Sequence, residues 1–137
     1  MPIVEEYVKM WPRTVFDIMD GNKLAINQKD GPLTKHGVCI LYRGQQPYYI
    51  GRALRGTGTL YKRLHSHADK STDGYFAFWD YFSAFVVENE EHIKEVEGIL
   101  IAAMPTENRA APRIKEVQIP KNIRNRLREA RRHPFRS

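Results

Sequence analysis

Four side chains of this sequence could together cleave a phosphodiester bond: Tyr49, Arg63, His67 and Glu97. Arginine is always protonated and presents a planar fork of donors, so Arg63 could hold a phosphate and offset transition-state charge. A phenol such as that of Tyr49 could orient an attacking water or accept its proton. His67 lies four residues after Arg63, on the same face of a helix, and could bind phosphate or assist proton transfer. Glu97 is one carboxylate at the border of an apolar stripe, and Mg²⁺ often takes a single protein carboxylate and keeps several waters.

Each of these residues also has an ordinary structural interpretation. Tyr49 could be a half-buried strand tyrosine, while Arg63 and His67 could form the polar face of an amphipathic helix. Glu97 could be a surface glutamate, as we expect for the other glutamates of its segment. The functional interpretation rests on the combination, in which Tyr49 is followed by Gly51 and then by the charged residues in order.

A β-hairpin is predicted to present the tyrosine. Residues 37–42 form a short apolar run, residues 43–47 contain turn-forming glycine and proline, and residues 48–51 resume extended structure. A third strand is predicted at residues 81–87, where aromatic and β-branched residues are dense.

Two helices are predicted to carry the charged residues. Thr59 can cap a helix over about residues 60–68, which would hold the arginine and the histidine on one face. Asn89 can cap a second helix, which carries the glutamate and stops at Pro105. The candidate site would therefore draw on one strand and two helices.

Residues 1–35 are interpreted as an N-terminal extension. Apolar residues between Ile3 and Trp11 recur at helical spacing, which predicts a short amphipathic helix that Pro12 interrupts.

Length and composition indicate one globular domain. A chain of 137 residues can bury about two-thirds of its unfolded surface. Cys39 is the only cysteine, which excludes an intrachain disulfide and a cysteine-rich zinc site. The N-terminus lacks a secretory pattern, and the apolar run 99–104 is too short to span a bilayer. We therefore expect a cytoplasmic protein without a membrane partner.

Positive charge is concentrated at the C-terminal end. Residues 106–137 contain ten Lys and Arg against three Asp and Glu, whereas residues 1–105 contain twelve against thirteen. Concentrated positive charge attracts polyanions by counterion release, so DNA is the expected partner and RNA is compatible with the same charge. On charge alone, a solvated tail that aids solubility is an equal alternative. A basic helix is predicted at residues 121–132, and its expected phosphate contacts are Lys121, Arg124, Arg128, Arg131 and Arg132.

The ordered motifs resemble those of the GIY-YIG nuclease family. The likeness covers about residues 36–110 and rests on Gly37-Val38-Cys39, Tyr49-Ile50-Gly51, Arg63, His67, Glu97 and Asn108. Members of this family are compact α/β domains with a three-stranded antiparallel sheet and flanking helices, and they cut DNA with one divalent metal. The resemblance implies an α+β nuclease core in which Glu97 holds Mg²⁺ or Mn²⁺.

The resemblance also implies supporting residues around this set. Gly51 would permit the turn after the tyrosine, Tyr61 would point toward the cleft, and Asn108 would support the site by hydrogen bonding. The first motif of the family usually ends in tyrosine, and this sequence has Cys39 there, which packs like a small hydrophobe. Further expected phosphate contacts near the site are Arg52, Arg55 and Lys62.

The sequence thus predicts a metal-dependent endonuclease that hydrolyses DNA, with residues 36–110 as the core and 111–137 as a basic segment of the same domain. One alternative is a catalytically inactive nucleic-acid-binding module of this fold, with Cys39 as the trace of lost catalysis. Another is an interaction protein, in which the aromatic cluster of residues 75–85 is a binding surface and the basic tail docks an acidic partner. Cutting both strands would require a dimer or two successive events, and the sequence leaves the oligomeric state open.

Overall fold

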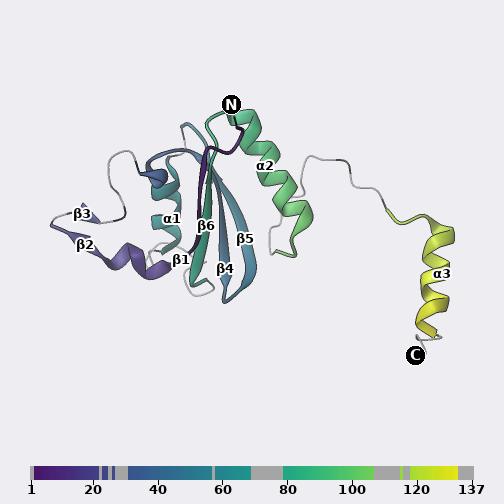
Figure 1. Ribbon diagram of the computed structural model, residues 1–137. Coiled ribbons are helices and arrows are strands. Elements are labelled where there is room, and N and C mark those ends of the chain that lie inside the picture. The colour runs from purple at the N-terminus through teal and green to yellow at the C-terminus, as the bar shows by residue number, and fades with distance from the viewer. Residues whose placement is uncertain are drawn as a thin grey trace.

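Figure 1 shows the computed structural model of the chain, which describes residues 2–21, 23–24, 26, 31–56, 58–68, 79–106, 115 and 118–132. The fold is α+β, with an open four-stranded antiparallel sheet and three α-helices among the described residues. None of the helices in this part of the chain combines the length and the apolar character needed to cross a membrane.

The sheet is built around the predicted hairpin. Its strands are β1 (Glu6–Pro12), β4 (Gly37–Arg43), β5 (Gln46–Ala53) and β6 (Tyr81–Val86), and their order is β1-β6-β4-β5. The hairpin (β4 and β5) and the third predicted strand (β6) are confirmed. The prediction of three strands was wrong, because β1 adds a fourth strand beside β6. A separate two-stranded ribbon joins β2 (Met19–Asp20) to β3 (Lys23–Leu24).

The predicted N-terminal helix is strand β1 instead. Its pairing with β6 is interrupted by a β-bulge between Val8 and Trp11, where Met10 has a φ of 51° and donates its backbone N–H to Ser83 Oγ at 3.1 Å. A bulge inserts an extra residue, so Val8 and Trp11, three positions apart, both pack into the core under α1. This three-residue spacing resembles helical periodicity, which is why the sequence pattern predicted a helix at the position of β1.

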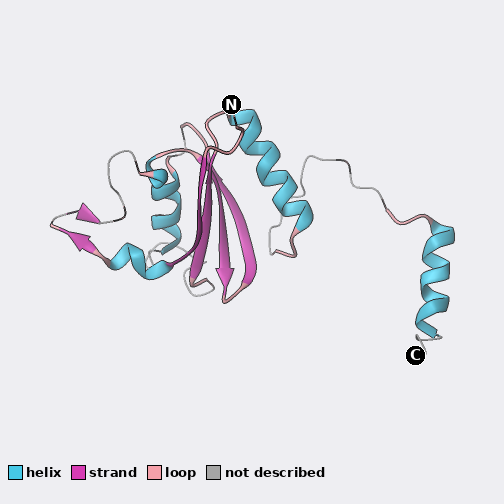
Figure 2. Ribbon diagram, in the orientation of Figure 1, coloured by secondary structure: helices cyan, strands magenta, loops and turns pink. Residues whose placement is uncertain are grey.

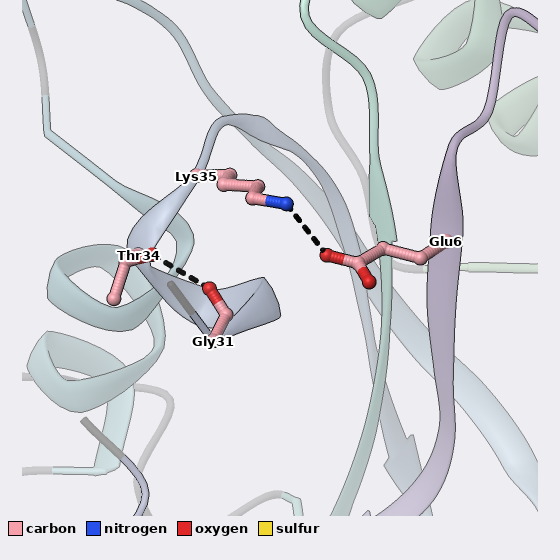
Figure 3. Close-up of polar contacts among 4 residues, drawn as sticks. All are labelled: Glu6, Gly31, Thr34 and Lys35. Atoms are coloured by element: carbon pink, nitrogen blue, oxygen red, sulfur yellow. Dashed lines mark hydrogen bonds and ion pairs between the residues drawn. The ribbon is translucent and has the colours of Figure 1, made fainter. Parts of the chain in front are cut away.

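The N-terminal segment is part of the core of the domain. Phe16 in the 3₁₀ turn η1 (Arg13–Asp17) and Leu33 in η2 (Pro32–Thr34) are both buried. Figure 3 shows how η2 is held: Thr34 Oγ1 donates to the Gly31 carbonyl at 2.6 Å, and Lys35 Nζ forms an ion pair with Glu6 Oε1 at 3.0 Å. The predicted extension is therefore tied to the sheet before β4 begins.

Two apolar clusters lie on opposite faces of the sheet. β4 is central and is buried on both sides, so it is a continuous apolar run rather than an alternating one. Its first residue, Gly37, lies so close to β6 that a Cβ there would collide with the Phe85 carbonyl oxygen. Of the aromatic cluster at residues 75–85, Trp79 and Phe82 are buried in the core, and residues 75–78 lie outside the described part.

One helix covers each face, as Figure 2 shows. α1 (Leu60–Ala68) packs on the face that carries Cys39, and α2 (Glu90–Ala103) packs on the opposite face. Both predicted caps are confirmed: Thr59 Oγ1 accepts from Lys62 N at 3.3 Å, and Asn89 Oδ1 accepts from Glu91 N at 2.9 Å. The predicted helices are thus present, and they approach the hairpin from both sides.

The predicted basic helix is confirmed as α3 (Lys121–Arg132). Figure 1 draws it apart from the sheet, and its side chains from Lys121 to Glu129 are all exposed. Over residues 121–129, the part of the helix whose side chains are described, α3 therefore exposes both its basic and its apolar residues.

Candidate active site

Tyr49 and Arg63 meet between β5 and α1. Arg63 Nη2 donates to the phenolic oxygen of Tyr49 at 3.4 Å, and both side chains are partly buried. The Nε of Arg63 is buried and has no hydrogen-bond partner within the described part of the chain. A buried N–H without a partner is costly, so this guanidinium is suited to an added acceptor such as a phosphate oxygen.

Gly51 has no side chain, and this leaves room for the ring of Tyr49 beside it. A Cβ on Gly51 would sit 3.0 Å from Tyr49 Cε2 and 3.6 Å from its hydroxyl oxygen. Contacts of 3.0 Å between carbon atoms are repulsive, so any larger residue would push the ring aside. Gly51 therefore positions the tyrosine. The predicted turn at Gly51 was wrong, because the residue lies within β5, which continues to Ala53, and its φ is not positive.

Cys39 lies directly across the hairpin from Gly51. Its sulfur would be 3.5 Å from a Cβ on Gly51, and its side chain is fully buried. Burial raises the pKa of the Cys39 thiol to about 11, and the nearby positive charge of Arg63 opposes this only in part. At neutral pH the residue is therefore an uncharged thiol under the tyrosine, and it packs as a small apolar group.

We expect Cys39 to resist alkylation in the folded protein. The thiolate is the reactive form, and both its raised pKa and its burial suppress that form. Iodoacetamide at about pH 8 should leave the native chain unmodified and should label the chain unfolded in guanidinium, as read by intact mass. Rapid labelling of the native protein would show that the sulfur is accessible.

Glu97 projects from α2 toward β5. Its Oε1 forms an ion pair with Arg52 Nη1 at 3.3 Å, with side-chain exposures of 17% for the glutamate and 37% for the arginine. Burial raises the pKa of Glu97, while the charges of Arg52 and Arg63 both oppose the rise. The negative charge of Glu97 therefore interacts with two guanidinium groups, that of Arg52 on β5 and that of Arg63 on α1.

The sequence interpretation missed the pairing of Arg52 with Glu97. The sequence predicts Arg52 as a phosphate contact, whereas in the structure it forms an ion pair with Glu97, the candidate metal ligand. The alternation of β5 carried a usable signal, because Arg52 is two residues after Ile50 and Ile50 packs on the α2 face. The choice of Glu97 as its partner depends on how α2 is placed.

His67 is buried against Tyr49. Its ring lies edge-on to the tyrosine ring, with centroids 5.6 Å apart and an angle of 66°, and the residue is 6% exposed. Its backbone carbonyl accepts from the indole N–H of Trp79 at 3.0 Å, which fixes the end of α1. The histidine is therefore placed to hold the tyrosine ring.

Tyr61 packs on another part of α1. It stacks on His65 with centroids 5.5 Å apart and an angle of 22°, and it lies 6.1 Å from the ring of Phe16. The structure thus brings together Tyr49, Arg63 and His67, whereas Tyr61 joins an aromatic cluster with η1. Asn108, the remaining supporting residue, lies outside the described residues.

The predicted phosphate contacts fall into two groups. Near the hairpin, Arg55 and Lys62 are exposed. Arg55 lines an open pocket of about 430 Å³ together with Glu88, Asn89 and Glu90, and none of the four candidate catalytic residues lines it. In α3, Lys121, Arg124 and Arg128 are exposed, whereas the side chains of Arg131 and Arg132 lie outside the described part.

Glu97 fits a metal that needs few protein ligands. Among the described residues, no group of three or more His, Cys, Asp or Glu side chains could form a cage for an ion. Mg²⁺ does not require such a cage, because it usually keeps several waters and binds one or two carboxylates plus substrate phosphates. A single, partly exposed carboxylate such as that of Glu97 matches that donor set.

Comparisons of the chain with models of protein families, with curated proteins and with solved structures found no match.

Proposed function

We propose that this protein is a metal-dependent endonuclease of the GIY-YIG type that hydrolyses DNA phosphodiester bonds. The observation that supports it most is the arrangement of Arg63, which donates to Tyr49 while its buried Nε lacks a partner among the described residues. A guanidinium anchored at one end and unsatisfied at the other is suited to hold a phosphate. Metal-dependent nicking of a supercoiled plasmid tests the proposal.

The proposed roles follow from the contacts of each residue. Arg63 binds the scissile phosphate and stabilises the charge that develops on it. Tyr49, fixed by Arg63, by Gly51 and by the ring of His67, orients the attacking water through its hydroxyl group or, as the phenolate, accepts the proton of that water. Glu97 would hold Mg²⁺ or Mn²⁺, which when bound supplies a Lewis acid for the phosphate oxygens. His67 acts through Tyr49 in this scheme, because it is buried against the tyrosine ring.

The basic helix α3 is proposed to hold the DNA backbone. Lys121, Arg124 and Arg128 share one face of the helix and are exposed. Phosphate contacts fix position without reading sequence, so α3 would add affinity rather than specificity. Its separation from the sheet in Figure 1 would let it contact phosphates away from the scissile bond.

Replacing Arg124 and Arg128 by Gln should weaken DNA binding and lower its salt dependence. Each lost phosphate contact should reduce the slope of log K against log salt by about 0.9. Arg126 is the matched control, because it is on the same helix, is also exposed and faces away from the other two. Fluorescence anisotropy over a range of salt concentrations measures both. An Arg126→Gln variant that lowers the slope as much as Arg124→Gln would contradict a defined basic face.

A catalytically inactive DNA-binding module is the second candidate, and Cys39 is the observation that favours it. The buried thiol cannot supply the phenol that the family places at this position, and its raised pKa keeps it uncharged. If the protein is such a module, it should bind DNA in a salt-sensitive way and form no metal-dependent cleavage product. Measuring binding and cleavage on the same preparation separates the two candidates.

A further inference from the structure

The carboxylate of Glu97 is already engaged by a cation of the protein itself. Arg52 Nη1 lies 3.3 Å from Glu97 Oε1, and the pair is partly buried rather than fully hydrated. Arg63 is also close enough to act electrostatically on the same carboxylate. One negative charge therefore faces two fixed positive charges.

This arrangement opposes the binding of a free metal ion. A divalent cation at Glu97 would have to displace the Arg52 guanidinium and then remain near two positive side chains, and like charges at close range repel. A phosphodiester has the opposite preference. Its oxygens accept from guanidinium donors in a bidentate manner, so it competes with Glu97 for Arg52.

We propose that Arg52 is a positioning residue whose ion pair with Glu97 blocks metal binding. A substrate phosphate would release the carboxylate by binding Arg52 in place of Glu97. Metal and DNA would then bind in a coupled order, with DNA raising the affinity for metal. By thermodynamic reciprocity, metal would raise the affinity for DNA by the same factor. This inference rests on the proposed function for the identity of the substrate, and its test can be read without cleavage.

The test measures Mn²⁺ binding to the full chain in the absence of DNA. Binding is read by calorimetry or from the electron paramagnetic resonance signal of free Mn²⁺. Arg52→Met removes the positive charge and keeps an apolar stem. Arg52→Gln is a second neutral variant, and Arg52→Lys restores the charge. Arg55→Met is the matched control, because Arg55 is exposed and lines a pocket with Glu88 and Glu90 rather than pairing with Glu97.

Mn²⁺ should bind Arg52→Met and Arg52→Gln at least about fivefold more tightly than wild type, within the usual range of coupling between sites. Arg52→Lys and Arg55→Met should remain close to wild type, and adding Glu97→Gln to Arg52→Met should remove the gain. Equal or weaker binding by both neutral variants, or no binding by any of the proteins, would overturn the inference. Failure of the wild type to cut DNA would instead overturn the nuclease function, while the Mn²⁺ comparison would still decide the role of Arg52.

Discussion

Glu97→Gln is expected to abolish metal-dependent cleavage and to leave DNA binding largely intact. The amide keeps the size of the side chain but removes the charge that would hold the ion. Losing about 4 kcal/mol of transition-state stabilisation, a typical scale for a metal acting on a phosphate, lowers the rate roughly a thousandfold. Without divalent metal, DNA affinity should stay level or rise slightly, because Arg52 loses its anionic partner and becomes available to phosphate.

Glu95→Gln is the matched control for this experiment. Glu95 is on the same helix and is exposed, so the variant makes the same change of charge away from β5. Single-turnover cleavage and anisotropy on each folded variant give the two readouts. Loss of binding together with cleavage in Glu97→Gln would argue against a metal role, as would equal loss of cleavage in Glu95→Gln.

Tyr49→Phe is expected to lower the cleavage rate by about 10² to 10⁴, the usual contribution of a positioned proton-transfer group. The change removes only the hydroxyl oxygen that accepts from Arg63 at 3.4 Å, and the ring can keep its contacts with Gly51 and His67. The affinity for DNA should change little, because phosphate binding falls to Arg63 and to the basic residues.

The neighbouring tyrosine supplies the control. Tyr48 is also partly buried, and the hydroxyl that accepts from Arg63 Nη2 belongs to Tyr49 rather than to Tyr48. Tyr48→Phe should retain nearly the wild-type rate. Equal rates for wild type and Tyr49→Phe would show that the phenol takes no part in the chemistry, and would place proton transfer elsewhere.

Local sequence patterns predicted the elements that carry the site. The helices α1 and α2 begin after Thr59 and Asn89 because each cap satisfies a backbone N–H of the first turn. The hairpin followed from an apolar run, a turn and a second extended segment. These signals are local, so they can be read without knowing the rest of the fold.

Two features of the molecule could not be read in this way. The bulge in β1 shifted the apolar pattern by one residue, so Val8 and Trp11 acquired a spacing typical of a helix. The pairing of Arg52 with Glu97 joins residues 45 positions apart, and it depends on where α2 packs against β5. Sequence patterns predicted which charged residues would lie near the hairpin. Which of them pair with one another depends on tertiary packing.

The most direct test of the nuclease proposal is a plasmid-nicking assay on the wild-type chain with Mg²⁺ or Mn²⁺, run beside a salt titration of DNA binding. Our account predicts conversion of supercoiled plasmid to the nicked form, which stops when the metal is chelated and is absent in Glu97→Gln. A wild-type preparation that binds DNA in a salt-dependent way and yields no metal-dependent product would contradict it, and would favour the inactive binding module.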